Sequence, residues 1–113
     1  MTSIQEKQLG QVRATTGGTA ESLYSPGSGV TAIIKTIVVC NQTGSADTFC
    51  VFLDDDGSTY TEETTLFKDV AIGANETIQI NCWYAMNNAA GNLAVEGATT
   101  DAVTFTAFGL EVS

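Results

Sequence analysis

Short runs of apolar and β-branched residues, separated by turns rich in glycine, asparagine, aspartate and serine, make up the whole chain. No segment carries the 3.6-residue apolar period of an amphipathic helix, so we expect strands throughout. The expected strands cover residues 8–13, 21–25, 30–41, 47–54, 64–70, 77–83, 92–97 and 102–112. Because no helix-length segment separates them, parallel crossovers are excluded. We predict an all-β fold, a single antiparallel β-sandwich that is jelly-roll-like and has seven or eight strands.

Two of the expected strands carry apolar residues on both faces. Residues 30–41 form the longest β run, and its apolar side chains point both ways, which indicates a central strand covered on most of both faces. In residues 102–112 the apolar positions change parity beside Gly109. A change of parity next to a glycine predicts a β-bulge at that glycine.

The single tryptophan lies at the end of a cleanly alternating strand. In residues 77–83 the alternation places Cys82 inward, Trp83 outward and Tyr84 inward again. An outward tryptophan on a sandwich can cover the edge of the core, pack in a subunit interface or stack on a sugar. The sequence leaves these three uses open.

The beginning of the chain differs from the rest. We predict that residues 1–18 form an N-terminal arm with a joint at Gly17-Gly18, and that residues 19–113 form the β-sandwich domain. The few apolar residues of the arm are spaced too irregularly for a clear core strand. Such an arm is either frayed or borrowed by a neighbouring copy, as an added strand or a docked extension.

Self-association is the prediction that follows. The edge strands of a sandwich can pair with strands of other chains unless lysine or proline residues on them prevent it. This chain has one proline and few lysines. We predict a homo-oligomer, with a trimer favoured. The interface candidates are Ile4, Leu9, Val12, Trp83 and Tyr84.

Composition narrows the classes of function. The chain has 113 residues, enough for one domain, and its thirteen acidic and four basic residues give a net charge of −9. This charge opposes binding to nucleic acid or to an anionic membrane. Because there is no histidine, every nucleophile that needs a histidine base and every metal site with a histidine ligand is excluded. We predict no enzyme, no catalytic residue and no cofactor.

An acidic stretch that begins at Asp54 is the motif that most resembles a metal-binding site. With Gly57 at the sixth position of a calcium loop, Asp54 and Asp56 fall at positions three and five and Glu63 at position twelve. Position one is then Phe52, which cannot bind a metal ion. We therefore predict a solvated hairpin loop and no metal site.

Three cysteines are present, Cys40, Cys50 and Cys82, and an odd number cannot pair fully within one chain. We expect buried free thiols in a protein made in a reducing cytoplasm, with a Cys40–Cys50 bridge across a hairpin as the alternative. The N-terminus has no basic segment followed by an apolar run, so no signal peptide is expected. No apolar run reaches the length of a membrane span.

Five segments carry a resemblance to a known family. They are Leu9-Gly10-Gln11, Leu23-Tyr24-Ser25-Pro26, the run from Ala32 to Asn41, the run from Ile72 to Thr77 and the run from Val103 to Glu111. Together they resemble small all-β bacteriophage virion proteins of the capsid decoration (cement) or tail-associated type. The resemblance covers nearly the whole chain. It consists of turns and core positions, so it transfers no functional residue.

The resemblance implies a non-enzymatic structural protein of a bacteriophage virion. Within that class we expect a decoration protein that binds the outer capsid surface as an oligomer, made in the host cytoplasm and located in the virion. Its partners would be further copies of itself and the major capsid protein or other virion proteins. The alternative is a tail- or fibre-associated adhesin or carbohydrate-binding module. An exposed aromatic cleft would favour sugar binding, whereas burial of Trp83 or Tyr84 between subunits would favour assembly.

Overall fold

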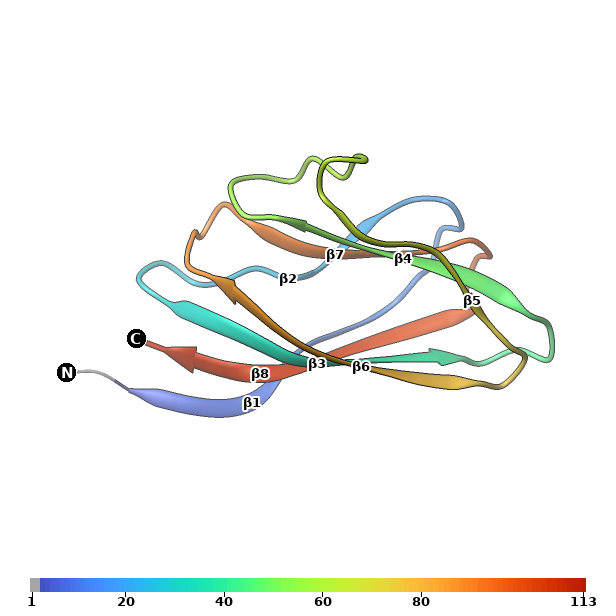
Figure 1. Ribbon diagram of the computed structural model, residues 1–113, viewed down its shortest axis with the longest axis horizontal. Coiled ribbons are helices and arrows are strands. Elements are labelled where there is room, and N and C mark those ends of the chain that lie inside the picture. Colours follow the sequence, from blue (N-terminus) through green and yellow to red (C-terminus); the bar gives the residue numbers. More distant parts are fainter. Residues whose placement is uncertain (1–2) are drawn as a thin grey trace.

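The computed structural model describes residues 3–113 as two four-stranded antiparallel sheets packed face to face (Figure 1). The strands are β1 (Ile4–Arg13), β2 (Glu21–Tyr24), β3 (Thr31–Asn41), β4 (Asp47–Asp54), β5 (Thr65–Ile72), β6 (Thr77–Met86), β7 (Asn92–Gly97) and β8 (Val103–Val112). Sheet A has the order β1-β8-β3-β6, and sheet B has the order β2-β7-β4-β5. This is the strand order of an eight-stranded jelly roll, which confirms the predicted fold class. Residues 3–113 contain no helix able to span a bilayer.

Strand boundaries follow the sequence most closely where the strand is buried. The bounds of β4 and β7 agree with the predicted residues 47–54 and 92–97. By contrast, β1 begins four residues before its predicted start, and β6 continues past Trp83 to Met86. Both extensions are held by backbone pairing with a neighbouring strand, because Ile4 lies opposite Val112 and Met86 opposite Ala32.

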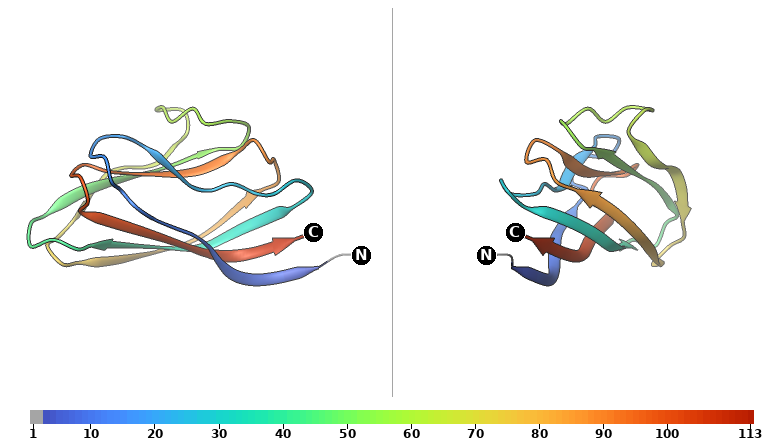
Figure 2. Two further views of the ribbon diagram at one scale, coloured as in Figure 1. Left: turned by 180° about the vertical axis from the view of Figure 1, so that it is seen from behind. Right: turned by 60° about the vertical axis from the view of Figure 1, so that its left-hand side comes forward.

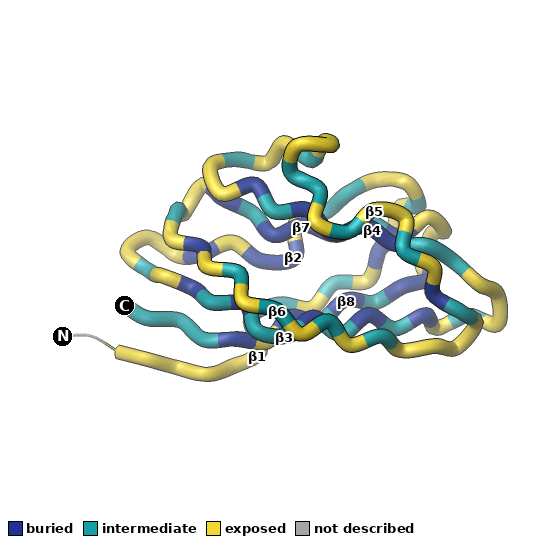
Figure 3. The backbone as a smooth tube through the Cα atoms, in the orientation of Figure 1, coloured by how far each residue is buried: buried dark blue, intermediate teal, exposed yellow. Residues whose placement is uncertain are grey.

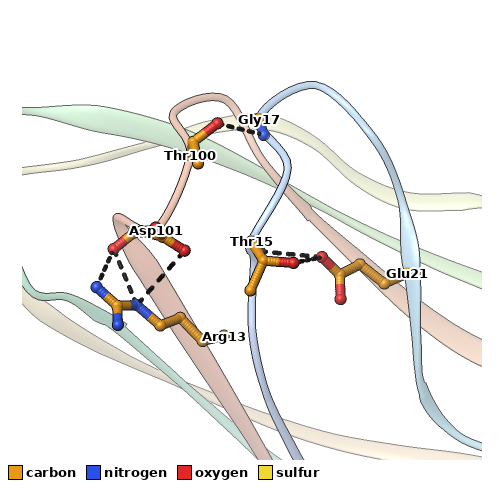
Figure 4. A network of polar contacts seen from close by, with 6 residues as sticks. All are labelled: Arg13, Thr15, Gly17, Glu21, Thr100 and Asp101. Atoms are coloured by element: carbon orange, nitrogen blue, oxygen red, sulfur yellow. Dashed lines mark hydrogen bonds and ion pairs between the residues drawn. The ribbon is translucent and has the colours of Figure 1, made fainter.

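The segment predicted as an arm forms β1, which pairs antiparallel with β8 of the same chain. The loop after β1 is fastened to the β7–β8 loop (Figure 4). The guanidinium of Arg13 donates to the carbonyl oxygen of Asp101 at 2.9 and 3.1 Å, and the amide of Gly17 donates to Thr100 Oγ1 at 3.0 Å. The arm is thus continuous with sheet A in a single chain, and its use by a neighbouring copy stays a prediction.

The core lies between the two sheets (Figure 3). Alternation along each strand turns every second side chain inward, so that Ile37 and Val39 of β3 face Phe49 and Val51 of β4. The rings of Phe49 and Phe105 meet edge to face, with their centroids 6.0 Å apart. Such a pair contributes about 1 kcal/mol beyond the burial of its area.

The predicted bulge at Gly109 is wrong. Strand β8 alternates regularly, and the register slips instead in its two neighbours, at Leu9 in β1 and at Lys35 in β3. Both slips lie beside Phe108. The glycine serves close approach, because a Cβ at position 109 would collide with the carbonyl oxygen of Ile33.

The prediction for residues 30–41 is half right. Strand β3 lies between β8 and β6, so it is a central strand. One of its faces is buried in the core, but the side chains on the other face, among them Ile33, Val38 and Cys40, are only half-buried. No other part of residues 3–113 lies over the outer side of sheet A (Figure 2).

Candidate interaction surface

The outer side of sheet A is rich in apolar residues. Alternation and register turn a set of large apolar side chains outward from all four strands. They are Ile4, Ile33, Val38, Trp83, Phe108, Leu110 and Val112. We call the outward-facing side of sheet A, with these residues, face A.

Three of these side chains are exposed to solvent. The exposed fractions of Ile4, Trp83 and Phe108 are 68%, 66% and 40%. Among the described residues, the other exposed large hydrophobic side chain is Leu66 of β5, also at 40%. Exposed apolar area is therefore concentrated on one face, which is the mark of an interaction surface rather than of scattered surface residues.

A row of polar contacts crosses face A. The ammonium of Lys35 lies 5.6 Å from the ring centroid of Trp83 and donates to Glu6 Oε1 at 3.2 Å. Glu6 and Trp83 are exposed and Lys35 is half-buried, so each contact contributes about 0–1 kcal/mol in water. Lys35 also lines a shallow groove with Glu6 and Phe108, and Phe108 is the one aromatic residue of that lining.

Face A carries few charged residues compared with the rest of the molecule. The outward positions of β6 and β8 hold no charged residue, and β3 contributes only Lys35. Strand β1 contributes Glu6 and Arg13. Of the acidic residues in the described chain, only Glu6 belongs to face A, although the whole protein carries a net charge of −9.

Part of the outer side of sheet B is covered by its own chain, whereas Leu66 of β5 is exposed there. Cys50, Phe52 and Ala94 form a small second cluster there, and Tyr60 of the β4–β5 loop packs on it with its ring 5.9 Å from that of Phe52. Burial raises the pKa of the Cys50 thiol, and the Asp69 carboxylate, which accepts a hydrogen bond from it, raises that pKa further. The three cysteines of the chain are free thiols, so the Cys40–Cys50 alternative is wrong, but only Cys50 is buried, and Cys40 and Cys82 are half-buried.

The structure divides the predicted interface candidates into two groups. Ile4 and Trp83 are exposed on face A, whereas Leu9, Val12 and Tyr84 pack against the core of their own chain.

Residues of β8 complete face A and were missed by the sequence reasoning. The outward Phe108, Leu110 and Val112 are the residues whose parity suggested a bulge. Their signal was present in the sequence, as apolar residues on both faces of one strand.

The acidic stretch forms a loop whose first carboxylate is used within the loop. Asp54 Oδ2 accepts the backbone amide of Thr59 at 2.8 Å, and Oδ1 accepts that of Asp56 at 3.3 Å. These hydrogen bonds lower the pKa of Asp54. Within residues 3–113, no group of three or more potential ligand side chains is arranged to hold a metal ion.

No protein-family model and no curated protein matches the chain. Among solved structures, it is similar to a chain of the T13 particle of infectious bursal disease virus, with a TM-score of 0.52 and 9% identity over 98% of this chain and 30% of that one. Chains from the Gx strain and from the VP2 subviral particle of that virus give TM-scores of 0.49 and 0.46, with 11% and 9% identity. These two matches cover 99% and 98% of this chain and 33% and 32% of those chains.

The chain thus spans about a third of the length of the viral chains that it matches. At such low identity the likeness concerns the fold alone. It agrees with the two-sheet arrangement described above.

Proposed function

We propose that this protein is a non-enzymatic structural component of a bacteriophage virion, namely a capsid decoration (cement) protein that binds the outer capsid surface as a homo-oligomer. The observation that carries this proposal is face A, where large apolar side chains lie among uncharged polar ones and few charges are present, on a strongly acidic protein. Solvent-exposed faces of a jelly roll are ordinarily polar, so an apolar face indicates a partner. The likeness to a chain of a viral particle supports a virion setting through the fold.

The partners in this proposal are further copies of the chain, in a trimer, together with the major capsid protein or other virion proteins. A decoration protein needs one surface for its own oligomer and another for the particle. Face A serves one of these contacts, and the loops and edges of the sandwich remain for the other.

Sugar binding by a tail or fibre module receives less support. The exposure of Trp83 suits stacking on a sugar ring. However, the Lys35 ammonium lies over the Trp83 ring, and Phe108 is the one aromatic residue in the groove beside it. An exposed cleft lined by several aromatic rings is not formed by the described residues.

Quantitative mass spectrometry of gradient-purified particles from the organism or virus that encodes this chain tests the proposal. We expect the chain to co-purify in a fixed and high ratio to the major capsid protein. Antibodies against the chain should label the outer surface of intact particles. A ratio of only a few copies per particle would indicate a tail component, and absence from the particles would refute a virion role.

A further inference from the structure

Face A needs a partner that covers it, and a second copy of this chain fits best. This inference rests on the homo-oligomer proposed above. We propose that face A is the surface through which copies of this chain assemble, three copies turning their A sheets toward a common axis. Phe108 of the inner strand β8 lies near the middle of the contact, and Trp83 of the edge strand β6 lies where two neighbouring A sheets meet.

Charge favours a second copy of the chain as the occupant of face A. Two molecules that each carry a net charge of −9 repel each other, and the repulsion acts over about 10 Å at 0.1 M salt. Contact through face A brings together Glu6, Arg13 and Lys35 from each copy, and because Lys35 pairs with Glu6 and Arg13 with Asp101, this surface is close to neutral. The other acidic residues then point away from the contact.

The outer side of sheet B cannot offer the same contact. It presents Asp69 and Glu96 beside Cys50, and the β4–β5 loop with Tyr60 already covers its apolar cluster. A second copy of the chain offers its own face A, which has the same apolar area as the first and carries few charges. In a threefold ring each copy contacts its two neighbours through two different parts of face A, and because the ring closes, face A of every copy is buried.

The size of face A is sufficient for a stable assembly. Four strands about 4.8 Å apart, each of about ten residues at about 3.4 Å per residue, give a sheet of roughly 600 Å² in projection. Specific interfaces bury about 800 Å² of accessible surface per partner, and side-chain relief makes accessible area larger than projected area. Each copy can thus bury about the area of one standard interface, which a trimer divides between its two neighbours.

The width of the sheet also fits a threefold arrangement. Three sheets about 19 Å wide, set as the sides of a triangle, lie roughly 5–6 Å from the central axis, and packed sheets are spaced about 10 Å apart, or about 5 Å of side chain each. The side chains of three A sheets therefore fill the space around the axis without a large void. A glycine in β8, Gly109, keeps β3 and β8 close at the centre of this surface.

The row from Glu6 through Lys35 to Trp83 crosses sheet A from one edge strand, β1, to the other, β6. Buried aromatic residues near the centre of an interface carry most of its binding energy. Lys35 is already paired with Glu6 within one chain, so the pair enters the contact neutralised and its desolvation costs less than that of a lone charge.

The test measures the mass of the full chain in solution by sedimentation equilibrium. We expect the wild type to be a trimer of 11.8-kDa subunits at micromolar concentration. Trp83→Glu and Phe108→Glu each place a charge on face A and should raise the dissociation constant at least 100-fold. Leu66→Glu is the matched control, because Leu66 has the same exposed fraction as Phe108 but lies on sheet B, and it should leave the trimer intact.

The fluorescence of the single tryptophan gives a second measurement that needs no variant. Dilution of the wild type should shift the Trp83 emission to longer wavelength and increase its quenching by acrylamide, because dissociation returns the ring to water. Circular dichroism checks that each variant keeps the β fold. If Phe108→Glu fails to fold, Trp83→Glu decides, since its side chain is 66% exposed in the single chain.

The outcomes separate this inference from the proposed function. A monomeric wild type overturns the inference, and so does an oligomer that persists in both face A variants. Neither result affects the proposed virion role, which is tested separately by co-purification with particles. A dimer that dissociates with these variants supports face A as the contact and overturns the threefold arrangement. A trimer that dissociates with them, in a chain absent from particles, supports the inference and refutes the virion role.

Discussion

Asn41 is the polar side chain most fully enclosed by the fold, with 1% of its surface exposed. Its Nδ2 donates to the carbonyl oxygens of Ser45 and Gly73 at 2.8 and 3.0 Å. Its Oδ1 accepts the amide and the hydroxyl of Thr43 at 3.0 and 2.9 Å. Asn41 therefore joins the β3–β4 turn to the turn between β5 and β6 at one end of the sandwich.

Replacement of this side chain by its carboxylate analogue, Asn41→Asp, keeps its shape and removes both donors. The carbonyl oxygens of Ser45 and Gly73 then face an oxygen atom, and each buried acceptor without a partner costs about 1–3 kcal/mol. We expect the free energy of unfolding to fall by about 3 kcal/mol at pH 7, and the melting temperature by about 10 °C.

The loss should depend on pH. Only the protonated carboxyl can donate to a carbonyl, so the folded state raises the pKa of the new Asp above its unfolded value of about 3.9. The variant is therefore least destabilised below that unfolded pKa, and its deficit grows as the pH rises through the raised folded pKa.

Urea unfolding followed by circular dichroism at pH 3.5 and pH 7 measures this deficit relative to the wild type at each pH. Asn87→Asp, the same chemical change at an exposed position, is the control and should stay within about 0.5 kcal/mol of the wild type. An Asn41→Asp variant as stable as the wild type at pH 7, or one with the same deficit at both pH values, would refute the reasoning.

Two further variants examine how β8 is held in the sandwich. Gly109→Ala should lower the free energy of unfolding by at least about 2 kcal/mol, because its Cβ meets a backbone carbonyl oxygen. Gly44→Ala, whose Cβ would meet no atom within 4 Å, should change it by less than about 1 kcal/mol in the same urea titration. Hydrogen bonds from Lys7 and Tyr24 lower the pKa of Glu111, so the stability that it contributes is present at neutral pH and is lost as the pH falls through that lowered pKa. An NMR titration should show the pKa of Glu111 rising toward its ordinary value in Tyr24→Phe, and an unchanged pKa would contradict this assignment.

The positions of the strands along the chain were predictable because alternation and turn residues are local signals. Residues 77–83 show this well, since the inward Cys82 and the outward Trp83 lie as the period of two requires. The pairing of strands was not predictable in the same way. It depends on contacts between distant segments, such as Val12 beside Phe105, that no local pattern records.

The misplaced bulge has a physical explanation that bears on function. Periodicity along β8 shows that apolar side chains occupy both faces, but it does not say whether the strand slips or both faces are apolar. The bulges at Leu9 and Lys35 leave β8 regular, so Phe108 and Leu110 point outward. The pattern attributed to a bulge was therefore the sequence signal of face A.

A cryo-EM map of intact particles from the source of this chain tests the central claim most directly. The account predicts trimeric density for the eight-stranded jelly roll on the outer capsid surface, with the three A sheets turned toward the threefold axis and Trp83 buried among them. Jelly-roll density in which face A is open to solvent, or a map in which the chain has no place on the capsid, would contradict the account.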